Sequence, residues 1–147
     1  MTVKDFINAY VSHANRVAEL YNVPSLVTLA QAAWESGWGS HAPAYNFFGM
    51  TAGDNWTGDV QYLTTTEYRN GQRVKVKRAF RAYPNPLIAF SDYAKNLASK
   101  TNYQAAFNFI HDPEMFFKKV FEGGYATDPN YEKNVLIVMT MIKKYVK

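Results

Sequence analysis

The sequence predicts a mostly helical protein that is interrupted by a single β-hairpin. Two observations support this fold class. Apolar residues recur at helical intervals near both ends of the chain, and a middle segment alternates between apolar and polar residues. Within that segment, Asn70-Gly71 is a two-residue turn signal of the kind that joins antiparallel strands.

Two helices are predicted in the N-terminal part of the chain. Apolar residues repeat at helical spacing from Val3 to Tyr21, and Val23-Pro24-Ser25 interrupts the pattern. Serine is a common helix cap, so we expect Ser25 to cap a second helix from Leu26 to about Ser36. Gly37 and Gly39 should end this helix, because glycine readily adopts the left-handed conformation that follows a helix.

The middle of the chain predicts a loop followed by the hairpin. Residues 42–58 are rich in Pro, Gly, Asn and aromatic residues, as is typical of a loop. The strands are expected from Val60 to Tyr68 and from Arg73 to Tyr83. In the second strand, alternation predicts that Val74 and Val76 face the core. The basic residues between and beside them should then face water: Arg73, Lys75 and Lys77.

Helical spacing resumes after Pro84-Asn85-Pro86, where four segments are predicted. The first carries apolar residues from Leu87 to Leu97, and a shorter helix is expected near Tyr103 to Ile110. Asp112-Pro113-Glu114 should open the next helix, which stops at Gly123-Gly124. We expect the last helix to begin at Asp128-Pro129, with Asp as the cap and Pro in the first turn.

Bulk composition is typical of one domain, here spanning residues 1–147. Hydrophobic residues make up 48% of the 147 residues, which is enough for a buried core. The net charge of +4 favours anionic partners, such as nucleic acid, anionic lipid or acidic wall polymers, without choosing among them. The absence of cysteine excludes disulfides and thiol catalysis. No signal peptide is visible, and no apolar run is long enough to span a membrane.

Carboxylates are the best candidates for catalytic groups. The three histidines, His13, His41 and His111, are scattered and form no zinc-binding pair. The sequence contains neither a phosphate-binding glycine loop nor a Gly-x-Ser-x-Gly motif. We therefore expect no metal ion and no cofactor.

Glu35 is the strongest candidate for a catalytic acid. It ends an apolar segment and is flanked by Trp34 and Trp38. A carboxyl group placed against indole rings is poorly solvated, which raises its pKa and lets it hold a proton near neutral pH. Cleavage of a glycosidic bond needs such a proton on the leaving oxygen. From the local sequence alone, a solvated glutamate at a helix end is an equally good interpretation.

Glu67, near the expected hairpin tip, is the second candidate. A carboxylate there would activate water or stabilise an oxocarbenium-like transition state. Spacing alone favours a structural role, in which Glu67 pairs with basic residues of the returning strand. Six basic residues between Arg69 and Arg81 are also compatible with binding to a phosphate backbone, although a solvated strand face is the preferred interpretation.

Several blocks of the sequence resemble glycoside hydrolase family 73, the peptidoglycan glucosaminidases. The segment from Leu29 to Gly39 is similar to the signature around the catalytic glutamate of that family. Two departures, Phe47 for leucine and Met50 for isoleucine or valine, keep the apolar character. Other blocks follow in family order over nearly all of the chain: Tyr45–Met50, Trp56-x-Gly58, Thr65–Tyr68, Asn70-Gly71, Phe80-Arg81-x-Tyr83, Ser91-Asp92-Tyr93 and Gly124–Tyr131.

The resemblance implies an α+β lysozyme-like fold, with a helical bulk, a small β-hairpin lobe and a cleft between them. It implies that Glu35 is the general acid, that Glu67 is a second catalytic carboxylate and that Tyr125 lines the active site. Asn46 would shape its loop or bind an acetamido group. The positions at which the resemblance implies substrate binding are Ser36, Trp38, Asn46, Phe47, Phe48, Gly49, Trp56, Asp128 and Tyr131. For the aromatic residues Trp38, Phe47, Phe48 and Trp56, core packing is an almost equally good interpretation.

The second half of the mechanism stays open at this point. Glu67 would act as a base that activates water, which inverts the anomeric carbon. Alternatively, the 2-acetamido group of the substrate would act as the nucleophile, with Glu67 and Tyr125 orienting it.

The activity expected from the resemblance is cleavage of the peptidoglycan backbone by an endo-β-N-acetylglucosaminidase. Two alternatives remain: an N-acetylmuramidase or lytic transglycosylase of the same fold, and a non-enzymatic basic module that binds wall polymer or nucleic acid. The expected partner is the peptidoglycan glycan strand, with no nucleic acid and no stable membrane insertion, and the expected state is a monomer. Action in the cell wall or periplasm would require another export route, release by lysis, or a place within a larger protein.

Overall fold

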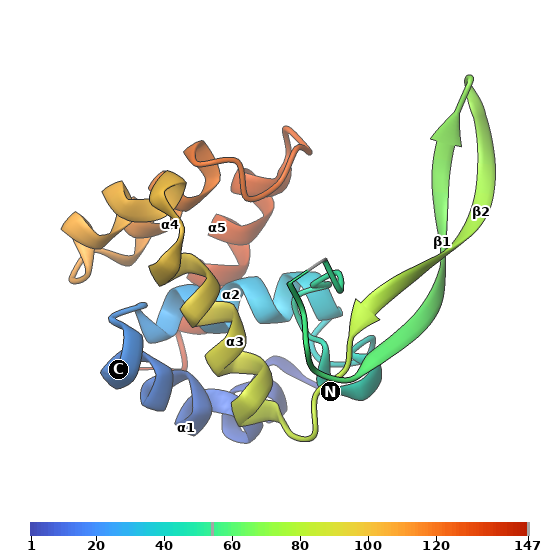
Figure 1. Cartoon of the computed structure of the whole chain (residues 1–147). Helices are drawn as coiled ribbons and strands as arrows, with labels where there is room; N and C mark the ends of the chain where they lie inside the picture. The colour runs from blue at the N-terminus through green and yellow to red at the C-terminus, as the bar shows by residue number, and fades with distance from the viewer. Residues whose placement is uncertain (54, 147) are drawn as a thin grey trace.

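A buried central helix organises the helical part of the structure. The computed structural model describes residues 1–53 and 55–146. In it, α2 (Ser25–Ser36) contacts α1 (Val3–Tyr21), α4 (Pro113–Glu122) and α5 (Tyr131–Lys143) (Figure 1). Residues 27–33 of α2 are all buried. Burial on every side explains why this helix consists of apolar and small residues, with Gln31 as the largest polar exception.

Two more helical segments complete this body. The helix α3 (Pro86–Ser99) packs against α1, and the 3₁₀ segment η2 (Thr101–Phe109) packs against α4. A short 3₁₀ turn, η1 (Pro43–Tyr45), precedes the hairpin. Among the described residues, no helix has both the length and the apolar character needed to cross a membrane.

Local sequence signals explain most of the helix boundaries. Thr2 caps α1 in a capping box with Asp5, and α1 has the expected bounds. The carboxylate of Asp112 accepts a hydrogen bond from the Met115 N–H at 3.3 Å, so α4 begins as expected. The side chain of Asn85 caps α3 in the same way, through the Ile88 N–H at 2.9 Å.

Two expected caps are wrong. Ser25 is the first residue of α2 rather than its cap, and its hydroxyl instead donates to Oδ1 of Asn15 at 2.7 Å. The last helix begins at Tyr131, after Asn130 as N-cap. Asp128 lies before it and accepts from the Asn130 N–H at 2.9 Å. The helix α5 therefore begins later than expected, because the side chain of Asp128 forms a turn before the helix instead of capping it.

One antiparallel hairpin projects from the helical body, formed by β1 (Val60–Arg69) and β2 (Gln72–Arg81) (Figure 1). The mostly helical fold with one hairpin is therefore confirmed. The second strand ends at Arg81 rather than Tyr83, because the Tyr83 N–H leaves the ladder and donates to Ala44 O at 2.9 Å.

The two faces of the hairpin differ in exposure. Thr64 pairs with Lys77 and Thr66 with Lys75 on an exposed face, as alternation predicts for the basic residues. On the other face, Val74 and Val76 are only half-buried. They do not reach the helical core, because the ribbon stands away from the helices (Figure 1).

Candidate active site

An open cleft of about 680 Å³ lies beside the C-terminal end of α2. It receives residues from α2, the loop before the hairpin, α3, η2 and the segment that leads into α5. The described part of the chain contains no group of three His, Asp or Glu side chains arranged to hold a metal ion. The cleft is lined by Trp34, Glu35, Phe48, Gly49, Met50, Thr51, Arg81, Asn96, Lys100, Tyr103, Gly124, Tyr125, Ala126, Thr127, Asp128 and Tyr131.

Glu35 reaches the cleft because it is the penultimate residue of α2, which ends at Ser36. Gly37, with φ +57°, adopts the left-handed conformation that terminates the helix, and its N–H donates to Ala33 O and Trp34 O. Across the cleft, Gly49 has φ +63°, and a Cβ placed there would lie 3.7 Å from Oε2 of Glu35. A glycine therefore permits the left-handed backbone and keeps one approach to the carboxyl group open.

The environment of Glu35 favours its protonated form. Its side chain is exposed to the cleft, yet the cleft walls displace part of the surrounding water. This desolvation raises the pKa of Glu35, and a hydrogen bond with Tyr131 partly opposes the rise in pKa. Glu35 consequently holds its proton to higher pH than an ordinary surface glutamate.

A buried polar chain lies behind Glu35. Nε2 of Gln31 donates to the Tyr131 hydroxyl at 3.1 Å, and the Tyr93 hydroxyl donates to Oε1 of Gln31. Desolvation raises the pKa of Tyr131 and of Tyr93 above the ordinary tyrosine value. Both hydroxyls therefore stay protonated and remain able to donate hydrogen bonds.

Tyr125 and Asp128 both line the cleft, as the resemblance implies. The Tyr125 ring is stacked against Tyr131, with centroids 5.9 Å apart and an interplanar angle of 26°. Burial also raises the pKa of Tyr125 well above its ordinary value, so its hydroxyl is neutral. The Tyr125 hydroxyl is therefore a neutral polar group beside the cleft.

Glu67 lies on the hairpin and is absent from the residues that line the described cleft. Its carboxylate is bound by Arg78, whose Nη2 donates to Oε1 at 2.6 Å and whose Nε donates to Oε2. Nη2 of Arg69 lies 3.9 Å from the same carboxylate. The hydrogen bonds from Arg78 lower the pKa of Glu67, which therefore stays ionised.

Three of the expected substrate-binding residues lie in the core instead of the cleft. The buried Ser36 hydroxyl donates to Ala32 O at 2.6 Å and accepts from the Gly39 N–H at 2.9 Å. Trp38 packs edge-on against Phe6, with centroids 5.6 Å apart. Phe47 is 1% exposed and packs against the rings of core residues, Tyr10 at 4.9 Å and Phe90 at 5.3 Å. These positions correspond to packing roles.

Phe48 and Gly49, by contrast, are part of the cleft wall. Phe48 is buried for most of its surface, because its ring stacks on Tyr93 at 3.9 Å with an interplanar angle of 9°. It therefore supports the wall beside Glu35 more than it presents a free ring face.

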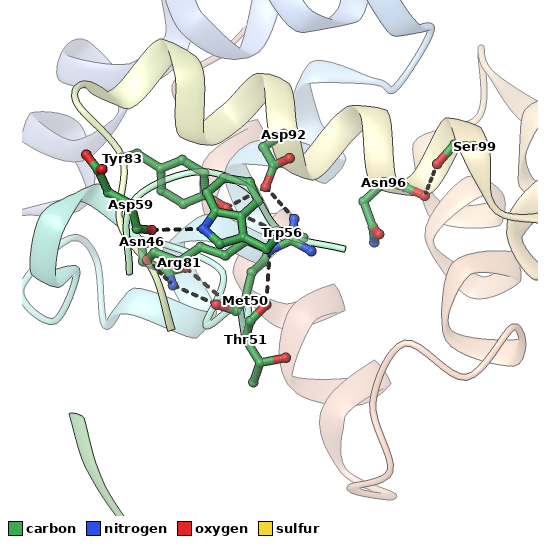
Figure 2. Close-up of polar contacts among 10 residues, drawn as sticks. All are labelled: Asn46, Met50, Thr51, Trp56, Asp59, Arg81, Tyr83, Asp92, Asn96 and Ser99. Carbon is green, nitrogen blue, oxygen red and sulfur yellow. Dashed lines mark hydrogen bonds and ion pairs between the residues drawn. The ribbon is translucent and has the colours of Figure 1, made fainter. Parts of the chain in front are cut away.

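Asn46 and Trp56 build the base of the hairpin (Figure 2). Nδ2 of Asn46 donates to Met50 O and Arg81 O, each at 3.0 Å, and its Oδ1 accepts from the Met50 N–H. This geometry corresponds to the loop-shaping role. Nε1 of Trp56 donates to Asp59 O at 2.9 Å, and the Arg81 guanidinium lies 4.6 Å from the centre of its ring. The ring of Trp56 thus packs against the guanidinium group of Arg81.

Arg81 ties the base of the hairpin to α3. Its Nη1 donates to Oδ2 of Asp92 at 2.7 Å, and the Tyr83 hydroxyl donates to the same oxygen at 2.6 Å (Figure 2). Its Nε also donates to Thr51 O at 3.0 Å. Because Arg81 lines the cleft as well, these contacts set the position of one cleft wall.

Sequence reasoning missed several residues of the cleft. Trp34 is 42% exposed and lines it, although the sequence indicated only that Trp34 neighbours Glu35. On α3, Asn96 follows Asp92 by one helical turn, and Lys100 comes one turn later. That spacing from the Ser91-Asp92-Tyr93 block was the available signal for the α3 side of the cleft.

Comparison with known proteins identifies what this chain resembles. The glucosaminidase family model, described as mannosyl-glycoprotein endo-beta-N-acetylglucosaminidase, matches residues 11–144. The peptidoglycan hydrolase FlgJ of Salmonella typhimurium is 40% identical over 147 residues, covering 95% of this chain and 46% of the relative. The chain therefore spans about half the length of this curated relative.

Solved structures give the same result for the fold. A C-terminally truncated glycoside hydrolase domain from Salmonella typhimurium FlgJ has a TM-score of 0.84 at 39% identity, covering 97% of this chain and 99% of that chain. A peptidoglycan hydrolase from Sphingomonas sp. A1 has a TM-score of 0.81 at 32% identity, covering 95% and 90%. The lysozyme-like arrangement of helices and hairpin is thus shared with these hydrolases.

Proposed function

The chain belongs to the glucosaminidase family of glycoside hydrolases, and from this premise we propose that it hydrolyses the glycan backbone of peptidoglycan with Glu35 as the general acid. Support for the substrate comes from relatives that are named peptidoglycan hydrolases and match most of this chain. The observation that carries the role of Glu35 is its position in the cleft, where desolvation raises its pKa.

The chemistry required of Glu35 follows from that environment. A protonated carboxyl group donates its proton to the glycosidic oxygen as the bond to the anomeric carbon breaks. Aromatic side chains of the cleft supply flat surfaces for sugar rings, with Trp34 the most exposed of them. The open cleft suits a polymer that enters and leaves at its ends.

The proposed bond is the one that follows N-acetylglucosamine. The description of the matched family as an endo-beta-N-acetylglucosaminidase supports this choice. Mass spectrometry of borohydride-reduced digests of purified peptidoglycan tests it. Reduced N-acetylglucosamine ends are the expected product. Reduced muramic acid ends would indicate a muramidase, and anhydromuramic acid ends a lytic transglycosylase.

Glu35→Gln tests the role of the acid. The substitution keeps the shape of the side chain and removes the proton that is donated, so we expect at least a ~10³-fold loss of kcat, at the scale of a lost essential catalytic group. Binding to insoluble peptidoglycan should persist. Full lytic activity of Glu35→Gln would contradict the assignment and favour a different acid, and the absence of lysis in the unsubstituted protein would favour a binding module.

Whether Glu67 acts as the second catalytic group depends on whether its carboxylate separates from Arg78. If Glu67 is the base, this ion pair has to open and the hairpin has to bring the carboxylate to the cleft. If the 2-acetamido group of the substrate attacks instead, Glu67 is dispensable for that step. Glu67→Gln distinguishes the two: near-complete loss of kcat supports the base, and a partial loss supports substrate assistance.

A further inference from the structure

Gln31 is a polar residue with no place in the chemistry proposed so far. It is fully buried in the central helix α2, among the apolar residues Val27, Leu29 and Ala30. It also precedes Glu35 by four residues, so the two side chains lie one helical turn apart on the same side of α2. A buried amide is costly unless both of its ends are hydrogen-bonded, and here both ends are.

With the amide of Gln31 oriented as in the structure, the chemistry of its two ends determines the direction of both hydrogen bonds. The Tyr93 hydroxyl donates to Oε1 of Gln31, which can only accept. Nε2 of Gln31 can only donate, and it donates to the Tyr131 hydroxyl oxygen at 3.1 Å. The proton of the Tyr131 hydroxyl is then available to another acceptor, and the carboxyl group of Glu35 lines the same cleft as Tyr131. With Glu35 as that acceptor, every donor in the chain points toward it.

We propose that Gln31 is a positioning residue of the catalytic site, which orients the Tyr131 hydroxyl so that it donates to the Glu35 carboxyl group. This inference rests on the proposed role of Glu35 as the acid. Hydrogen bonds that point the same way polarise one another, so the amide of Gln31 makes Tyr131 a stronger donor. With the amide reversed, Tyr131 would have to donate to Gln31 instead.

The chain of donors acts at the moment of proton transfer. Glu35 gives its proton to the glycosidic oxygen as the C–O bond breaks, and Glu35 becomes a carboxylate. The Tyr131 hydroxyl then stabilises the new negative charge, and it does so more strongly than it stabilised the neutral acid. An interaction that strengthens in the transition state raises kcat without tightening substrate binding.

The other groups around Glu35 do not take over this role. Burial raises the pKa of the tyrosines around Glu35 and its cleft, so they are neutral in the working range: Tyr93 from α3, Tyr125 from the loop before α5, Tyr131 from α5 and Tyr103 from η2. Charged groups on the same cleft are Arg81, Lys100 and Asp128. Among the described hydrogen bonds, those of Gln31 run only to Tyr93 and Tyr131.

The first test compares Gln31→Met, which keeps the length of the side chain and removes the N–H donor, with Tyr131→Phe. For each we expect about a 10-fold lower kcat, the scale of one hydrogen bond to a charged group, with KM within about 2-fold. Because the ionised form of Glu35 loses stabilisation, the basic limb of the kcat/KM pH profile should move to higher pH. The double variant should match Tyr131→Phe alone, because Gln31 acts through Tyr131.

The matched control is Val27→Ala, one turn earlier in α2. Val27 is equally buried, and its side chain carries no polar group. We expect it to leave the pH profile unchanged. Losses of kcat that add up in the double variant, or a basic limb that stays in place in Gln31→Met, would overturn the proposal.

A second measurement depends neither on enzymatic activity nor on the folding of Gln31→Met. ¹³C NMR of the glutamate carboxyl carbons follows the titration of Glu35 in the unsubstituted protein and in Tyr131→Phe, which lacks a single oxygen atom. We expect the titration of Glu35 to move to higher pH in Tyr131→Phe. An unmoved titration would overturn the inference whether or not Glu35 is the acid, whereas an active Glu35→Gln would overturn only the proposed function.

Discussion

Arg78 holds the carboxylate of Glu67 on the hairpin through two hydrogen bonds, from Nη2 to Oε1 at 2.6 Å and from Nε to Oε2. Both side chains lie on the face of the ribbon that also carries Val74 and Val76. The pair keeps Glu67 ionised, which a catalytic base needs, and at the same time engages the oxygens that would bind water. The pKa values of Glu67 and Glu35 are therefore shifted in opposite directions, downward for Glu67 on the hairpin and upward for Glu35 in the cleft.

Arg78→Ala should move the acidic limb of the kcat/KM pH profile, which reports the free enzyme, to higher pH if Glu67 is the base. The pKa of Glu67 is lowered by hydrogen bonds from Arg78, so without Arg78 the carboxylate is protonated at a higher pH and activity is lost earlier on acidification. Stability should change little, because ion pairs on the surface contribute little to it. Arg73→Ala, on the opposite face, is the control. An unmoved acidic limb would argue for substrate assistance.

Glu35→Gln should be at least as stable as the unsubstituted protein at pH 7. Desolvation raises the pKa of Glu35 in the folded state, so between the unfolded and folded pKa values the folded chain binds more protons. Stability contributed by Glu35 therefore falls as pH rises through that window, and glutamine does not suffer this loss. We expect a Tm higher by at most about 4 °C at pH 7, since the open cleft screens part of the penalty.

Thermal unfolding at pH 7 and at acidic pH measures this difference. It should shrink as Glu35 becomes protonated in both the folded and the unfolded chain. Glu122→Gln, an exposed substitution on α4, controls for the general effect of removing a carboxylate. A Tm of Glu35→Gln clearly below that of the unsubstituted protein at pH 7 would mean that the carboxylate is stabilised by the fold.

Trp34→Ala should weaken substrate binding with little effect on folding. Trp34 is 42% exposed at the cleft, so its removal costs little core packing. Loss of a flat surface for a sugar ring should raise KM about 10-fold, or ~1.4 kcal/mol, with kcat within about 3-fold. Steady-state kinetics on soluble glycan fragments measures this. Leu20→Ala, at an exposed position on α1 that is not among the cleft-lining residues, should leave KM unchanged.

Asp92→Asn should loosen the base of the hairpin. Oδ2 of Asp92 accepts from Arg81 at 2.7 Å and from Tyr83 at 2.6 Å, and the side chains of Arg81 and Asp92 are only 20% and 21% exposed. Loss of the carboxylate leaves a partly buried guanidinium without its ion-pair partner. We expect a loss of about 2 kcal/mol, which lowers Tm by about 6 °C. Glu19→Gln, which breaks the exposed pair with Arg16, should lower Tm by less than about 2 °C.

The elements themselves followed from local sequence. Apolar spacing predicted α1 from Val3 to Tyr21, and Asn70-Gly71 placed the turn between Arg69 and Gln72. Both results depend on the backbone preferences of neighbouring residues and on repeat lengths of 3.6 and 2, which a sequence displays directly. Glu35 was also visible locally, as a carboxyl group at the glycine-terminated end of an apolar helix.

The direction of each side chain near the site was decided by tertiary structure. Phe47 and Phe48 are adjacent, yet one packs against core rings and the other forms part of the cleft wall. Trp34 and Trp38 lie on either side of Glu35 in the sequence, but after the left-handed turn at Gly37 only Trp38 packs against Phe6. The two residues of each pair are of the same type. Only the path of the chain and the neighbouring residues in the fold distinguish their positions.

The same division applies to the polar groups of the site. The sequence by itself determined that Glu35 ends a helix and that Gln31 precedes it by one turn. It did not determine that Tyr93 and Tyr131, 62 and 100 residues away from Gln31, bind the two ends of its amide. It predicted that a basic residue of the returning strand pairs with Glu67, but not that this residue is Arg78. Hydrogen bonds between distant segments form only after the helices pack, because packing alone brings those donors and acceptors within reach and removes the competing water.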